Sequence, residues 1–146
     1  MIEIIVHGEP APQGSKRYVG RHGGRGLMIE SSAKVKPWRE AVKWAAIEAM
    51  RAQDITEPLD GPLSVQMVFT LRKPASAPKR TRTFPDRKPD LSKLVRSTED
   101  ALTDAGLIVD DARIVTLIAF KLFPEFDDAD ALAAPGAVIR LWRIEA

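Results

Sequence analysis

Apolar and polar residues alternate at the start of the chain and again near its middle, which is the pattern of strands with one buried face. Ile2, Ile4 and Val6 alternate with polar residues, so a first strand is predicted there. Residues 63–71 repeat the pattern, with apolar residues at the odd positions and mostly polar residues at the even ones. We expect this second strand to pack one face on the core and to expose the other to solvent.

Two further segments carry apolar residues at helical spacing. In the first, Pro37 suits the opening turn and the pattern continues to about Arg51. The second begins after Asp90, a favoured capping residue, and ends at Gly106, a favoured terminating residue. Its apolar stripe consists of Leu91, Leu94, Val95, Leu102 and Ala105. Both segments are predicted to be helices.

Residues 114–123 are apolar almost throughout, and the segment is too short for a separate long helix. It is typical of a central strand that is buried on both faces. Val138 to Ile144 is predicted to be the closing strand. The order strand, helix, strand, helix, strand, strand predicts a two-layer α+β fold in which two helices cover one face of a mixed sheet. The length suffices for one core, so residues 1–146 are predicted to form a single domain.

Composition then excludes several kinds of chemistry. The chain has no cysteine, which rules out disulfides, thiolate metal sites and cysteine nucleophiles. Its first residues lack the basic segment and apolar run of a secretory signal, and no stretch has the length of a membrane span. We therefore expect a cytoplasmic protein with no membrane partner. The net charge of +2 is too small to indicate a nucleic-acid partner, so the distribution of charge has to decide.

Positive charge gathers in two segments that are rich in glycine or proline. Residues 8–26 hold six of the nine glycines and are expected to form a mobile basic loop. Residues 72–89 hold four prolines and seven basic residues against the single acid Asp86. Such clusters suit phosphate contacts, although a charge run is also common on ordinary solvated surfaces.

Carboxylates suited to a divalent cation flank the second helix. Phosphodiester hydrolysis needs a cation that activates water and neutralises the phosphate, and carboxylates from different elements hold Mg²⁺. Asp90 precedes the helix, and Asp110 and Asp111 follow the turn after it. These two ends can meet only if Leu107 to Val109 runs back along the helix. The alternative is structural, because aspartate also caps helices and is common in turns.

Two stretches carry a family resemblance. The sequence KPDLSKLVRSTEDALTDAGLIVDDARIV, residues 88–115, leads from an aspartate at a helix start through D-A-L and A-G to a D-D pair before a strand. The opening GEPAPQGSKR, residues 8–17, places glycine, proline, serine and lysine after the first strand. Together they resemble RusA-type Holliday junction resolvases. The resemblance implies a RusA-like fold and a homodimer that binds a four-way DNA junction and cuts two opposed strands symmetrically with Mg²⁺ or Mn²⁺, without a small-molecule cofactor.

The resemblance also assigns roles to single residues. Asp90 matches the first metal-binding aspartate of the family helix, and Asp111 matches the aspartate of its D-D pair. Arg96 stands where many relatives have a catalytic lysine, and because arginine stays protonated we expect it to stabilise charge and not to transfer a proton. Ser92 replaces the second helix aspartate, which predicts a weaker or differently built metal site. Asp110 is either a metal ligand, a partner of one, or an exposed turn residue.

Glu99 lies on the same polar stripe of the second helix as Ser92 and Arg96, and it is a candidate replacement ligand because its side chain leans toward the helix start. A surface pair between Arg96 and Glu99 is the simpler interpretation. The predicted DNA contacts are Lys16, Arg17, Lys79, Arg80, Arg82, Lys88 and Lys93. Two other functions stay open: a non-catalytic module that binds branched DNA, and a metal nuclease for flaps or other branched substrates.

Overall fold

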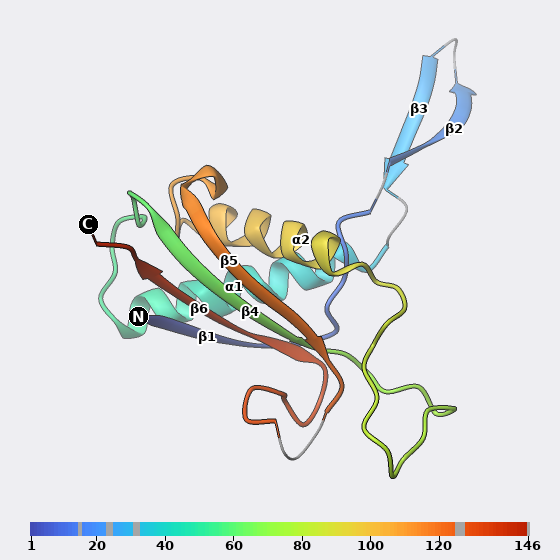
Figure 1. The fold of residues 1–146 in the computed structure, drawn as a ribbon. Coiled ribbons are helices and arrows are strands. Elements are labelled where there is room, and N and C mark those ends of the chain that lie inside the picture. The colour runs from blue at the N-terminus through green and yellow to red at the C-terminus, as the bar shows by residue number, and fades with distance from the viewer. Residues whose placement is uncertain (15, 23–24, 31–32, 125–127, 146) are drawn as a thin grey trace.

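Four strands form one mixed sheet in the computed structural model, in the order β1-β6-β4-β5 (Figure 1). β1 (Ile2–His7) pairs antiparallel with β6 (Gly136–Arg143), which pairs antiparallel with β4 (Leu63–Thr70). β4 in turn pairs parallel with β5 (Ile114–Leu122). The structure describes residues 1–14, 16–22, 25–30, 33–124 and 128–145.

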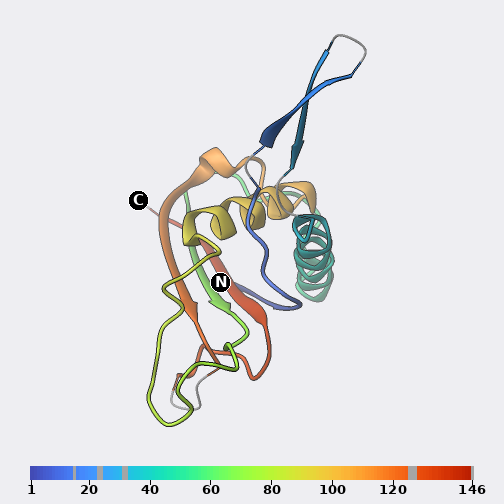
Figure 2. The same ribbon diagram turned by 90° about the vertical axis from the view of Figure 1, so that its right-hand side faces the viewer.

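Two helices cover one face of this sheet, as the turned view in Figure 2 shows. α1 (Val35–Ala52) and α2 (Leu91–Asp104) begin and end close to the predicted positions, because their apolar spacing sets the face that packs. Gly106 follows α2 with φ of 79°, the left-handed conformation that commonly ends a helix. The predicted two-layer α+β fold is confirmed. Among the described residues, no helix is both long enough and apolar enough to span a membrane.

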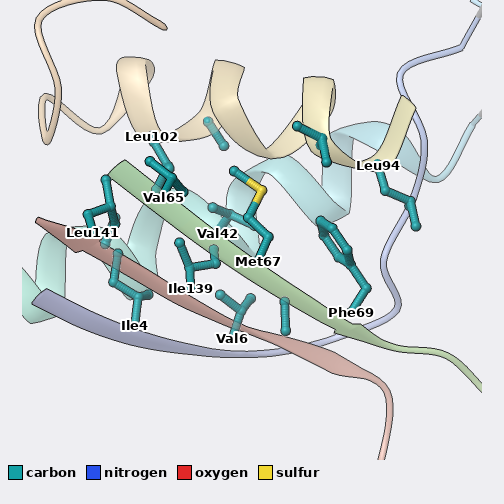
Figure 3. Close-up of a cluster of buried hydrophobic side chains, with 14 of the residues drawn as sticks. Ile4, Val6, Val42, Val65, Met67, Phe69, Leu94, Leu102, Ile139 and Leu141 are labelled. Carbon is teal, nitrogen blue, oxygen red and sulfur yellow. The ribbon is translucent and has the colours of Figure 1, made fainter. Parts of the chain in front are cut away.

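The core lies between the sheet and the two helices (Figure 3). Trp38 of α1 is buried against Phe69 of β4, with ring centroids 6.4 Å apart. The indole Nε1 of Trp38 donates a hydrogen bond of 3.2 Å to the Thr98 hydroxyl of α2, so the polar atom of this large side chain is satisfied inside the core. Ser97 donates to the carbonyl of Ala11 at 2.7 Å and ties the segment after β1 to α2. These contacts position α2.

Two strand environments differ from their predictions. β4 is buried on both faces and not on one. It lies between β6 and β5, and at its last residue Thr70 Oγ1 accepts a hydrogen bond of 2.9 Å from the backbone N–H of Leu132. β5 is the edge strand, so the prediction of a central strand buried on both faces is wrong. Its exposed apolar side chains are Val115 (63%), Leu117 (42%), Ile118 (48%) and Phe120 (46%).

The first basic segment also differs from its prediction. Within residues 8–26 the structure has β2 (Lys16–His22) and the start of β3 (Arg25–Glu30), which pair antiparallel as a separate two-stranded sheet. This hairpin projects from the body of the fold (Figure 1). The sequence did not predict this hairpin, because its glycine-rich segments lack the alternation of a strand that packs on the core. The two strands pair with each other and not with the main sheet. Residues 72–89, in contrast, contain no helix or strand, as predicted.

Candidate metal site and DNA-binding surface

Asp90 stands at the N-terminus of α2, and its side chain makes no capping hydrogen bond. The carboxylate is exposed, and its Oδ2 lies 3.8 Å from the Nζ atom of Lys93 in the first turn. Asp90 therefore occupies the N-cap position without making the hydrogen bond for which aspartate is favoured there. Its oxygens are directed toward solvent, where an ion can reach them.

Lys121 of β5 holds the chain that leads into Asp90. Its Nζ atom donates to the carbonyl oxygens of Arg87 and Pro89, both at 2.9 Å. Sequence reasoning missed this residue, although it left a signal: Lys121 is the one charged side chain in β5. The lysine fixes the C-terminal end of β5 to the N-terminal end of α2.

Asp110 and Asp111 lie at the opposite end of α2. Asp110 accepts a hydrogen bond of 3.0 Å from the backbone N–H of Ala112 and so caps the short 3₁₀ helix η1 (Asp111–Arg113). That hydrogen bond is the main reason why the pKa of Asp110 is lowered. Contact with the Asp110 side chain, followed by burial and nearby negative charge, raises the pKa of Asp111. Asp110 thus has a structural role as a cap. The ionised form of Asp111 is less favoured than that of Asp110.

Glu99 of α2 lies close to Asp111. Burial raises the pKa of Glu99 to about 7, and the negative charges of Asp111 and Asp100 raise it further, while Arg96 acts in the opposite direction. The carboxylates of Glu99, Asp100 and Asp111 therefore lie near one another on α2 and beside it. The positive charge of Arg96 does not balance their negative charges. Such crowding of ionisable groups is more common at functional sites than elsewhere. The positive charge of Arg96 lowers the pKa of Glu99 but does not offset burial and the neighbouring negative charges, and the predicted surface pair between Arg96 and Glu99 stays a prediction.

The two ends of the site do not meet within one chain. α2 has 14 residues and is thus roughly 21 Å long. After the helix the chain pairs with the segment before β4: the N–H of Leu59 donates to the Leu107 carbonyl at 2.8 Å, and the N–H of Val109 donates to the Leu59 carbonyl at 3.1 Å. Asp111 lies near Glu99, which is nine residues, or roughly 13 Å of helix, from Asp90. The described residues contain no group of three or more His, Cys, Asp or Glu side chains arranged to hold a metal ion.

The donors that lie together nevertheless fit a hard divalent cation. Mg²⁺ is commonly held by one or two carboxylates with water completing its coordination, and Mn²⁺ accepts the same oxygen ligands. Glu99 and Asp111 supply two such carboxylates, and a cation between them would favour the ionised form of Glu99, whose pKa is raised by burial and by the charge of Asp111. Ser92, which replaces the expected aspartate, is an exposed residue of the first turn of α2.

The second basic segment provides an exposed positive surface. Lys79, Arg80 and Lys88 are exposed. Arg82 is already engaged, because it lies 3.2 Å from Asp128 and its guanidinium stacks over the Phe84 ring at 5.0 Å. A cleft of about 450 Å³ lies within this segment. Its walls combine apolar and basic side chains, among them Leu71, Pro78, Phe84, Arg87, Lys88 and Phe123.

Of the other predicted DNA contacts, Lys93 is a half-buried residue of α2 whose Nζ atom lies 3.8 Å from Asp90 Oδ2. Lys16 and Arg17 belong to β2, but their side chains lie outside the described residues. The predicted DNA contacts whose side chains the structure describes therefore lie mainly in the segment that leads directly into Asp90. A polyanion bound there would pass the N-terminal end of α2.

Comparison with known protein families matches residues 7–128 to Endodeoxyribonuclease RusA. The chain belongs to the RusA family. A search of curated proteins finds no match. The matched range contains both ends of α2, the basic segment and the β2–β3 hairpin. RusA proteins are Holliday junction resolving nucleases, so the family agrees with the resemblance found in the sequence.

Proposed function

We propose that this RusA-family protein is a homodimeric, Mg²⁺- or Mn²⁺-dependent endonuclease that resolves four-way DNA junctions by paired symmetric nicks. The observation that supports it best is the proximity of Glu99 and Asp111, with a Glu99 pKa of about 7, inside the matched range. When bound, the divalent ion lowers the pKa of a water molecule and neutralises charge on the phosphate. Two sites related by a two-fold axis suit a junction with two-fold symmetry.

The side chains of this chain have separate tasks in that reaction. Asp111 and Glu99 would hold the ion, and Asp110 keeps Asp111 in place by capping η1. Arg96 is exposed on the same side of α2 and carries a permanent charge that can contact a phosphate through two N–H groups. Because arginine keeps its proton, it neutralises charge and does not act as the general acid.

DNA binding is assigned to the exposed basic segment. We expect the variant with Lys79→Ala and Arg80→Ala to bind a junction more weakly and with a lower salt dependence, since each lost phosphate contact removes roughly one released counterion. Lys36→Ala with Lys43→Ala on α1 is the matched control, because it removes the same charge from a helix outside the site. Equal binding and equal salt slopes for the two variants would contradict the assignment.

Asp111→Asn tests the metal site. The change keeps the size of the side chain and removes its charge, so cleavage of a synthetic four-way junction should collapse while junction binding persists. Asp54→Asn is the matched control, because Asp54 is exposed after α1 with φ of 53°, a conformation that asparagine also adopts. Cleavage is measured with Mg²⁺, with Mn²⁺ and with chelator. Undiminished cutting by the Asp111 variant would overturn the assigned site.

Ser92→Asp tests the departure from the family pattern. If the serine weakens the site, the added carboxylate should lower the Mg²⁺ concentration needed for half-maximal cutting. If Glu99 already replaces the missing ligand, Ser92→Asp should leave that Mg²⁺ concentration unchanged. Glu99→Gln should then raise the Mg²⁺ concentration needed for half-maximal cutting.

A non-catalytic module for branched DNA is the second candidate, favoured by Ser92 and by the separation of Asp90 from Asp111 in one chain. It predicts junction binding without cutting at any metal concentration. Linear duplex and flap substrates in the same assay distinguish a junction resolvase from a nuclease for other branched DNA.

A further inference from the structure

The cleft within the basic segment lies beside the N-terminal end of α2. Its volume of about 450 Å³ is in the range of sites that hold one small molecule, and it is too small for a duplex. Lys88 and Pro89 border the cleft, and Asp90 follows them in the chain. Lys121 donates to the carbonyl oxygens of Arg87 and Pro89, both at 2.9 Å, and so fixes this border. A group held in the cleft therefore has a defined position relative to the start of α2.

Phe84 presents an aromatic ring to this cleft. The residue lines the cleft and is 60% exposed. The Arg82 guanidinium lies over the ring, 5.0 Å from its centroid, and Arg82 is held in turn by Asp128 at 3.2 Å. Arg82 is not among the described residues that line the cleft, so it leaves the cleft side of the ring uncovered. Phe84 is thus a supported platform on which another flat group can stack.

The cleft is apolar where it is buried and mainly basic where it is exposed. The buried residues that line it are all apolar: Pro10, Leu71, Pro85 and Phe123. The exposed basic residues that line it are Arg72, Arg87 and Lys88. Two acids, Glu9 and Asp86, also line the cleft, and Glu9 lies 3.5 Å from the Nζ atom of Lys34. A nucleotide has the same division, because its base has apolar faces and its phosphate is an anion.

A half-buried hydroxyl group favours a nucleobase over a purely apolar ligand. The hydroxyl oxygen of Thr83 is buried and has no hydrogen-bond partner among the described residues, which costs free energy. Thr83 lines the cleft, so rotation of its side chain can bring the hydroxyl to a donor or acceptor of a bound group. The edges of nucleobases carry such groups, whereas an apolar peptide side chain carries none.

We propose that the cleft holds one unstacked nucleobase of the bound DNA, an inference that rests on the junction proposed above as the substrate. The base stacks on Phe84, and the phosphates beside it contact Arg87 and Lys88 at the rim. Removing a base from a duplex stack costs free energy, and the cost is lower where pairing and stacking are already interrupted. A branch point is such a place. The cleft would therefore favour branched DNA over linear duplex.

Phe84→Ala tests the platform. Binding of a synthetic four-way junction is measured in chelator, so that no cutting occurs. The variant should bind about tenfold more weakly, because stacking of a base on an aromatic side chain contributes an effect of that order. Its salt dependence should equal that of the wild type, since the ring carries no charge and releases no counterion. This result would distinguish the variant from Lys79→Ala with Arg80→Ala, which should bind with a lower salt dependence.

Two further variants are controls for Phe84→Ala. Trp44→Ala removes another exposed aromatic side chain, 54% exposed on α1 and not part of the cleft, and should bind the junction as the wild type does. Phe84→Trp keeps a flat aromatic surface and should retain tight binding. Together they separate the loss of the platform from a general effect of truncating an aromatic residue.

Abasic nucleotides identify the bound base. Junctions that each lack one base beside the branch point are compared for the wild type and for Phe84→Ala. At one position, loss of the base should weaken binding of the wild type about tenfold and leave binding of Phe84→Ala unchanged, because one contact cannot be lost twice. At the other positions the effects of the missing base and of the missing ring should add.

Two outcomes would overturn the inference. One is an additive effect of the missing base and the missing ring at every position. The other is a Phe84→Ala variant that binds the junction as tightly as the wild type, which would mean that the cleft serves a different ligand, such as a peptide. If the wild type binds the junction no more tightly than a linear duplex, the proposed function fails instead. The comparison of wild type with Phe84→Ala on a single-stranded oligonucleotide then still tests the cleft.

Discussion

β4 and β5 are neighbouring parallel strands of similar length and similar apolar content, yet they lie in opposite environments. β4 has a strand on each side, and all but one of its residues are buried. β5 has one neighbouring strand and exposes four large apolar side chains. The difference shows that position in the sheet decides burial in the monomer. Apolar residues of β4 stabilise the fold, and we propose that those of β5 stabilise the proposed homodimer by pairing with β5 of a second copy about a two-fold axis.

Phe69→Ala is expected to have the largest effect, because the ring is fully buried on β4 against Trp38. Its loss should reduce the free energy of unfolding by about 3–5 kcal/mol, through lost burial and the cavity left behind. Chemical denaturation followed by Trp fluorescence measures this change. A loss below about 1 kcal/mol would mean that β4 contributes no more to the fold than an exposed strand.

Ile118→Lys should weaken the dimer without destabilising the fold of the protomer. The residue is near the middle of β5, so two lysines would face each other close to the two-fold axis, and like charges at close range oppose pairing. We expect a folded monomer at micromolar concentration in analytical ultracentrifugation, with an unfolding free energy close to that of a wild-type protomer.

Ile5→Lys is the control for that variant, since Ile5 has the same exposed fraction of 48% on the outer face of β1. It should remain dimeric. Monomers for both variants, or dimers for both, would show that β5 is not the interface.

Phe120→Ala should have a smaller effect of the same kind. Phe120 is 46% exposed, so its truncation should change the stability of the protomer by less than about 1 kcal/mol. A buried aromatic side chain at an interface contributes about 2 kcal/mol, so the dissociation constant of the dimer should rise roughly thirtyfold. The comparison with Phe69→Ala is direct, because both variants remove the same ring from adjacent strands. Equal losses of protomer stability would contradict the inferred division of roles.

Glu99→Gln should give the smallest effect and reports on the crowded carboxylates. The pKa of Glu99 is about 7 in the folded protein against 4.5 ordinarily, so the folded state binds a proton more tightly than the unfolded chain. Stability from this group is complete below pH 4.5 and is lost as the pH rises to 7. The variant should therefore match the wild type at pH 4 and exceed it at pH 8 by about 1 kcal/mol, after allowance for solvent screening.

Thermal unfolding at the two pH values measures this difference. Mg²⁺ should stabilise the wild type at pH 8 more than it stabilises Glu99→Gln, since the bound ion offsets the same repulsion. A wild-type stability that rises between pH 4.5 and 7 while that of the variant does not would contradict the raised pKa.

The sequence by itself determined the elements whose signals are local. The spacing of apolar residues and the residues Asp90 and Gly106 placed α2 within two residues of its bounds, and alternation placed β1 and β4. The order of these elements predicted the two-layer α+β fold. The D-D pair and the helix-start aspartate were found because motif residues lie close together in the chain, and the RusA family match confirms the resemblance that they carry. Their roles as metal ligands stay a prediction.

Only the tertiary structure decided which strand lies at the edge, because pairing partners distant in sequence determine that position. An apolar run such as β5 is compatible with a buried centre and with an edge that binds a partner, and periodicity is the same in both cases. Pairing of Leu59 with residues 107–109 holds the chain before Asp110 and Asp111, and Lys121 holds the chain before Asp90. Both are contacts between residues far apart in the chain. Local pattern fixes what each segment forms, whereas long-range contacts fix which segments meet.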